Sequence, residues 1–179
     1  RKIVARFYGS PPVRSYFSGC SNGGRMGAIA MQRYPELFDG VIIGAPALDW
    51  RTLSLYSVAV TAANTDAQGR YILDHKKLAV LHDAVVQECD ARDGLTDGLI
   101  ADPRQCRFDA RTLLCSVGEN EGACLTREEV QTVEGWYAGL QNGHGVDWPF
   151  RMLQGSEPYW RRWYAPAPGQ RGAGYLFSD

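Results

Sequence analysis

The chain has 179 residues, of which 45% are hydrophobic and 22% charged, and its formal net charge at pH 7 is −1. This length is enough for one domain with a sizeable core. Its near-neutral charge, without a basic stripe, argues against nucleic acid as a partner. No apolar run approaches the ~18 residues of a membrane span, so we do not expect a membrane partner either.

The chain opens with a segment typical of the end of a helix. Residues 1–8 have a helical composition, and Gly9 follows them in the position of a helix C-cap. A short apolar segment at residues 13–18 then predicts a buried strand. The far end, GAGYLFSD, stops without a closing element. We therefore expect the chain to be an internal piece of a longer protein.

The first strand leads into GCSNG at residues 19–23, a G-x-S-x-G motif. Helical spacing begins at once over residues 22–34, which gives the strand–turn–helix context of a nucleophile elbow. The two glycines permit close backbone approach in so sharp a turn, and Gly24 extends this. Ser21 is the candidate nucleophile, and the Asn22 amide is the expected oxyanion donor. The alternative is a glycine-rich turn with an ordinary serine.

A second strand is predicted at residues 38–45, where the run Val-Ile-Ile suits a parallel strand covered on both faces. Pro46 and Trp50 follow it and are expected to line or support the site. The character of the sequence changes between residues 50 and 69. We therefore divide the chain into residues 1–60 and residues 61–179.

Two helices are predicted next. Residues 52–67 are amphipathic and rich in small residues. A clearer helix begins after Asp74, its expected N-cap. One face of this second helix carries four apolar residues: Leu78, Leu81, Val85 and Cys89.

Three histidines are candidates for a catalytic base. His75 and His82 lie on the second of these helices, and His144 lies on a later loop. Each is a weak candidate, because the base of a hydrolase with such an elbow follows the last strands. A surface histidine is the plainer interpretation of His75 and His82, whereas His144 is slightly better placed on its loop but has no strand before it.

The sequence CDARDGLTDGLI at residues 89–100 holds three carboxylates, Asp90, Asp93 and Asp97. Hard oxygen ligands at this density suit Ca²⁺. An EF-hand alignment fails in part, because Leu95 stands where an acid is expected. On this pattern alone, a glycine-rich turn with solvated acids is an equal alternative.

Five cysteines are present, and no C-x-x-C pair occurs among them, so a zinc site is a poor interpretation. Disulfides are the better one, and they imply an oxidising compartment. If Cys89 pairs with Cys106 and Cys115 with Cys124, each closing a nearby loop, Cys20 is left over.

The second half of the chain contains one more clear helix signal. Thr126 and Glu129 form a capping box at its start, and Asn142-Gly143 would end it. Four apolar residues mark one face of this helix: Val130, Val133, Tyr137 and Leu140. The tail that follows is rich in arginine and aromatic residues, including Trp160 and Trp163.

The segments GCSNGGR and QRYPELFDGVIIGAPALDW resemble the tannase and feruloyl esterase family of α/β-hydrolases, which includes mono(hydroxyethyl) terephthalate hydrolase. In that family a cysteine precedes the nucleophilic serine and pairs with a cysteine that follows the catalytic histidine. Cys20 and Ser21 match the first half of this arrangement, and no His-Cys pair occurs here. The resemblance implies that the partner of Cys20, and the catalytic Asp and His, lie outside this chain, beyond residue 179.

The acidic segment also resembles the family's CDxxDGxxDG loop, which binds structural calcium in the lid domain. By position, the resemblance implies carboxylate ligands from Asp90, Asp93 and Asp97 and backbone carbonyl ligands from Leu95 and Leu99. Gly155, Glu157 and Trp160 likewise resemble the family's G-x-E-x-x-W pattern.

Together these observations predict an α/β protein. Residues 1–60 would be an α/β-hydrolase core fragment (strand, nucleophile elbow, helix, strand), and residues 61–179 part of a disulfide-stapled, calcium-binding lid. The expected function is a secreted or periplasmic serine esterase that cleaves small aromatic carboxylic esters, of feruloyl or galloyl type, through an acyl-enzyme on Ser21. The 179 residues alone are expected to be inactive. The alternative is an inactive, calcium-stabilised binding or structural module with a degenerate elbow.

Overall fold

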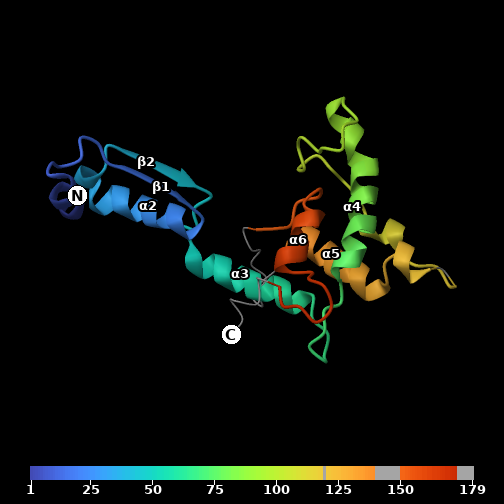
Figure 1. Ribbon diagram of the computed structural model, residues 1–179. Coiled ribbons are helices and arrows are strands. Elements are labelled where there is room, and N and C mark those ends of the chain that lie inside the picture. Colours follow the sequence, from blue (N-terminus) through green and yellow to red (C-terminus); the bar gives the residue numbers. More distant parts are fainter. Residues whose placement is uncertain (119, 140–149, 173–179) are drawn as a thin grey trace. The chain divides into compact units, whose positions relative to one another are not determined.

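The computed structural model describes residues 1–118, 120–139 and 150–172 (Figure 1). The chain forms two compact units, Arg1–Leu53 and Ser54–Asp179, and each is described by itself. The units divide within helix α3 (Trp50–Ala63), which also contains the predicted boundary after residue 60. Of the helices in the described ranges, none combines the length and apolarity that a membrane crossing requires.

The first unit is a small α/β arrangement. Helix α1 (Lys2–Tyr8) ends at Gly9, whose φ of 74° confirms the predicted C-cap. Strand β1 and strand β2 are parallel and are joined through helix α2 and a short 3₁₀ helix, η1. Their bounds are β1 (Tyr16–Cys20), α2 (Asn22–Arg33), η1 (Pro35–Leu37) and β2 (Gly40–Gly44).

The first strand is displaced from its predicted bounds, and the second is shorter than predicted but lies within them. The first begins three residues later and runs through Cys20, because pairing starts where Tyr16 lies opposite Gly40. Just before that pair, Asp39 accepts hydrogen bonds from the Ser15 amide and the Arg14 guanidinium at 2.8 and 2.9 Å. The parallel direction of the sheet was predicted correctly.

Helix α2 packs on the sheet through small residues. Gly24, Gly27 and Ala28 are its buried positions, whereas Met26 is 56% exposed. A Cβ added at Gly27 would lie 3.0 Å from the ring of Phe17 on β1, so a larger residue here would force the ring to shift. On β2, the side chain of Ile42 is 69% exposed. The described residues therefore do not bury both faces of this strand, contrary to the prediction.

The second unit is built from helices. Helix α4 lies beside α6 in this unit (Figure 1), and Lys77 of α4 forms an ion pair with Glu129 of α5 at 3.4 Å. Short 3₁₀ turns occupy the connections between them. The bounds are α4 (His75–Cys89), η2 (Asp90–Asp93), η3 (Ala110–Leu113), η4 (Glu121–Ala123), α5 (Arg127–Ala138) and α6 (Glu157–Trp163).

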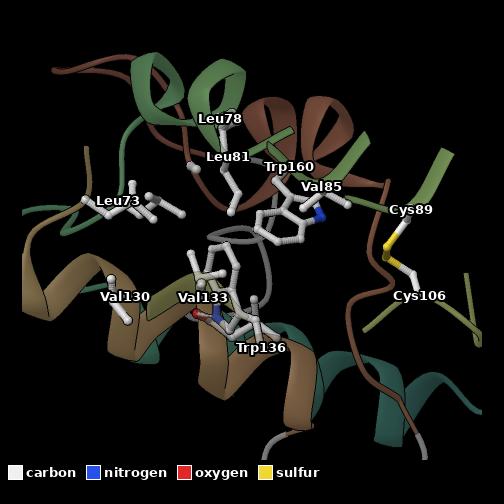
Figure 2. Packing of buried hydrophobic residues seen from close by; sticks show 14 of the residues in the cluster. Leu73, Leu78, Leu81, Val85, Cys89, Cys106, Val130, Val133, Trp136 and Trp160 are labelled. Atoms are coloured by element: carbon white, nitrogen blue, oxygen red, sulfur yellow. Dashed lines mark hydrogen bonds between the residues drawn. A yellow bond between two sulfur atoms is a disulfide. The ribbon is translucent and has the colours of Figure 1, made fainter. Parts of the chain in front are cut away.

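The core of this unit forms between α4 and two tryptophans. The predicted face of α4 is buried and points toward Trp136 of α5 and Trp160 of α6 (Figure 2). The two indole rings meet edge to face, with centroids 5.0 Å apart. Such pairs stabilise a core beyond the area they bury. Trp160 therefore packs within the unit's own core.

The predicted caps are largely confirmed. The Asp74 carboxylate accepts a hydrogen bond from the Lys76 amide at 2.8 Å, and Thr126 and Glu129 form both halves of the capping box. The predicted end of α5 at Asn142-Gly143 is wrong, because the helix stops at Ala138. The next residue, Gly139, leaves the helical conformation with a φ of 90°. The predicted residues Leu140, Asn142, Gly143 and His144 lie outside the described residues.

Two disulfides staple the second unit. Cys89 is bonded to Cys106 and Cys115 to Cys124, with Cα–Cα distances of 5.4 and 5.0 Å. Cys20 is free and exposed. The sequence therefore identified both pairs and the remaining thiol.

Candidate active site

Ser21 lies at the junction of β1 and α2, with φ 57° and ψ −120°. A residue other than glycine seldom adopts a positive φ, and such strain is concentrated at functional sites. The side chain is exposed, so the hydroxyl stands clear of the backbone. Local geometry at Ser21 is that of a nucleophile elbow.

Glycine is required at two positions of this turn. A Cβ added at Gly19 would meet the carbonyl of Gly23, and one added at Gly24 would lie 2.5 Å from the Gly44 carbonyl oxygen. The latter would also lie 3.1 Å from the Cα of Pro46, so Pro46 supports the turn as expected. By contrast, a Cβ at Gly23 would meet nothing within 4 Å. The second motif glycine is therefore not needed for close approach.

Asn22 is the first residue of α2. The amides of a first helical turn have no carbonyl partner within the helix, and they favour negative charge. An anion that forms at a carbonyl bound to Ser21 would lie at this end of the helix. This placement suits the role predicted for the Asn22 amide.

No histidine is joined to the Ser21 hydroxyl by a hydrogen bond within the described ranges. His75 and His82 both lie on α4 in the second unit. The Nδ1 of His82 is hydrogen-bonded to Glu157 at 2.8 Å, so this ring is committed elsewhere. His144 lies outside the described residues, and its candidacy stays a prediction.

Glu157 is a site that sequence reasoning missed. Its side chain is fully buried, and one oxygen accepts hydrogen bonds from the Tyr137 hydroxyl and the Gly155 amide, both at 2.7 Å. Burial and the nearby Glu157 charge raise the pKa of Tyr137 far above its usual value. The G-x-E-x-x-W pattern was the available signal, but it does not reveal that this carboxylate joins three helices.

The carboxylates of the acidic loop are turned toward the loop's own amides. Asp90, which is buried, accepts from the amides of Asp97 and Gly98 at 3.4 and 3.1 Å. Asp93 accepts from Leu95 and Ala101, and Asp97 accepts from Leu99. These contacts order the loop.

The oxygen donors of this loop suit Ca²⁺ in kind, because carboxylates and carbonyls are its usual ligands. In the part of the chain that the structure describes, however, no three His, Cys, Asp or Glu side chains gather into a group that could hold a metal. The loop as it stands therefore does not show a fitted cation site.

Comparison with known families gives one clear match. Residues 1–159 match the family described as tannase and feruloyl esterase. An uncharacterized esterase of Xanthomonas campestris is 35% identical over 98% of this chain, and a probable feruloyl esterase B-1 of Aspergillus oryzae is 32% identical over 88%. The chain spans 31% and 29% of the length of these two relatives.

Solved structures agree with this match. The crystal structure of feruloyl esterase B from Aspergillus oryzae superposes with a TM-score of 0.79 over 98% of this chain, at 30% identity. Tannin acyl hydrolase from Aspergillus niger superposes over 86% with a TM-score of 0.62, at 26% identity. The chain covers 35% and 30% of these two structures. The mixed α/β arrangement with its short parallel sheet therefore matches part of a feruloyl esterase.

Proposed function

Because this chain belongs to the tannase and feruloyl esterase family, we propose that it carries the nucleophile of a carboxylic ester hydrolase. The observation that supports this best is the conformation of Ser21 at the end of β1, directly before α2. The proposed substrates are small esters of aromatic carboxylic acids, of feruloyl or galloyl type. The feruloyl esterase and the tannin acyl hydrolase to which the chain is similar motivate this choice of acid.

In the proposed reaction the Ser21 Oγ attacks the ester carbonyl carbon and loses its proton to a general base. The carbonyl oxygen becomes an oxyanion, and the Asn22 amide donates a hydrogen bond to it. Collapse of this intermediate breaks the ester C–O bond, and the alcohol leaves with a proton. Water then attacks the acyl-enzyme, releases the aromatic acid and regenerates Ser21. We propose that the base, a histidine with its orienting Asp, lies beyond residue 179.

The test uses protein made from the complete reading frame that contains this chain. Replacing Ser21→Ala should lower kcat on methyl ferulate or methyl gallate by roughly 10⁴-fold or more, because the nucleophile acts as a unit with its base. Ser10→Ala, at another exposed serine of the same unit, is the matched control and should leave kcat unchanged. Activity that survives Ser21→Ala intact would exclude this proposal.

The rival function is an inactive module with a degenerate elbow. A serine-directed phosphonate distinguishes the two, because only an activated serine is labelled rapidly. We expect rapid labelling of Ser21 in the complete protein and slow labelling in the 179 residues alone. Slow labelling in both would favour the inactive module. Rapid labelling of the short chain would show that it contains a base, with His144 the first to test.

We further propose that the acidic loop binds structural calcium through Asp90, Asp93 and Asp97 and the carbonyls of Leu95 and Leu99. The resemblance and the oxygen-rich donor set support this, and binding would require the carboxylates to turn from loop amides toward a common centre. The two disulfides favour an oxidising compartment, so we propose a secreted or periplasmic protein. Cys20 would pair with a cysteine outside this chain.

A further inference from the structure

Two residues other than glycine have a positive φ in the described ranges, Ser21 at 57° and Ala45 at 37°. Ser21 directly follows β1, and Ala45 directly follows β2. Cys20 lies opposite Gly44 in the parallel register, so the two residues occupy equivalent positions at the ends of neighbouring strands. The strained conformation of Ser21 therefore has a second strained residue as its neighbour in the sheet.

The segment around Ala45 is hydrogen-bonded to both the amide and the carbonyl of Ser21. The Ser21 amide donates to the Gly44 carbonyl at 3.0 Å, and the Ala47 amide donates back to the Ser21 carbonyl at 3.3 Å. To make both bonds, the chain must turn back within the residues between Gly44 and Ala47. Ala45 makes this turn by entering the left-handed region, and Pro46 restricts the next φ.

The same segment also supports the start of α2. A Cβ at Gly24, in the first turn of this helix, would lie 2.5 Å from the Gly44 carbonyl oxygen and 3.1 Å from the Cα of Pro46. Residues 44–47 therefore touch both the peptide of Ser21 and the helical turn that begins with Asn22. A shift of this segment would move the nucleophile and the expected oxyanion donor together.

We propose that residues 44–47 position the nucleophile, and that Ala45 is the positioning residue whose left-handed conformation keeps Ser21 in its own strained conformation. A strained residue persists only when its surroundings over-determine it, and the two hydrogen bonds from this segment do so. Ala45 acts through Ser21 and does not itself take part in the chemistry. The inference rests on the proposed role of Ser21 as nucleophile.

The test uses protein from the complete reading frame and compares Ala45→Val with Ala45→Asn, two replacements of similar size. Valine and asparagine are similar in size, so a difference between the two variants should follow backbone preference. Ala45→Val disfavours a positive φ and should lower kcat and the phosphonate-labelling rate of Ser21 by roughly 10- to 100-fold, with KM within about twofold. Ala45→Asn and Ala45→Gly tolerate this φ and should stay within about threefold of the parent.

Two control variants accompany the test. Gly9→Val places valine at another left-handed position, φ 74°, with open space around it. It should lower the melting temperature without changing kcat. Ser21→Ala, measured alongside, tests the proposed nucleophile separately. If Ala45→Val does not fold, a loss of labelling well beyond threefold in Ala45→Asn overturns the positioning role, because asparagine tolerates this φ.

The result that overturns the positioning role is an Ala45→Val enzyme with parental kcat and labelling rate while Ser21→Ala is inactive. A loss of labelling in Ala45→Asn as large as that in the valine variant would also overturn it, because side-chain size would then be the cause. Activity retained in Ser21→Ala would instead exclude the proposed function.

Discussion

The Nδ1 of His82 lies 2.8 Å from the Oε2 of Glu157, a carboxylate without solvent exposure. The other oxygen of Glu157 accepts from Tyr137 and from the amide of Gly155. One buried side chain thus connects α4, α5 and the start of α6. A buried charge is tolerated only when it is paired and hydrogen-bonded in this way.

Replacing Glu157→Gln should destabilise the second unit. The glutamine carbonyl can still accept from Tyr137 and Gly155, but its NH₂ group then faces the Nδ1 of His82, and the carboxylate that the three groups surround is lost. We expect the free energy of unfolding to fall by roughly 2–4 kcal/mol, measured by urea denaturation. Glu128→Gln, at an exposed position in the first turn of α5, is the matched control and should change it by less than about 0.5 kcal/mol. Equal effects of the two variants would contradict the structural role of Glu157.

The elbow glycines should respond unequally to alanine. At Gly19 a methyl group meets the backbone of Gly23, so Gly19→Ala should displace the turn and lower both melting temperature and Ser21 labelling, the latter by about 10-fold or more. At Gly23 the methyl group meets open space within α2, so Gly23→Ala should be neutral or stabilising by up to about 1 kcal/mol. Labelling kinetics and thermal denaturation check both. A larger defect in Gly23→Ala would contradict the described turn.

The second unit should lose stability at high pH. Burial, and secondarily the neighbouring Tyr164, raises the pKa of Tyr56 from 10.0 to about 12. Because the folded pKa is the higher one, this contribution is intact below pH 10 and is lost as the pH rises toward 12. The urea midpoint should therefore fall over that window, and less steeply in Tyr56→Phe. Tyr159→Phe, at a side chain that is 77% exposed, should follow the parent.

Chelation should lower the melting temperature if the acidic loop binds calcium. EDTA would remove the ion that the proposed ligands share, whereas ester hydrolysis should change less, because Ser21 lies outside this loop. Asp90→Asn should abolish the effect of EDTA, and Asp83→Asn, at an exposed acid of α4, should preserve it. A parental melting curve that is identical with and without EDTA would count against the calcium site.

The elements that could be predicted are those with local signals. Asp74 and Thr126 cap helices through contacts within a few residues, so their sequence neighbours suffice to identify them. The strand, turn and helix around Ser21 were predicted for the same reason, because they are consecutive in the sequence. Both disulfides close short loops, of 17 and 9 residues in sequence separation, and were accessible to the same reasoning.

The features that were missed have no signal in the local sequence pattern. Glu157 is hydrogen-bonded to His82, which lies 75 residues away in the sequence, and no spacing in the sequence predicts this contact. The packing of α2 through Gly27 depends on the ring of Phe17 on β1, which the helical pattern alone does not show. Glycine and asparagine are the residues that usually indicate a positive φ, and Ala45 is neither. Its conformation is therefore known only from the structure.

Cys20 is a thiol that can be labelled chemically next to Ser21. It is the free thiol of the five cysteines in this chain, it is exposed, and it immediately precedes Ser21. In the isolated chain, a thiol-reactive fluorophore would therefore attach one residue from Ser21 without touching the stapled loops. The same accessibility would let two copies of the isolated chain cross-link under air, so purification under mild reducing conditions keeps this spectroscopic handle available.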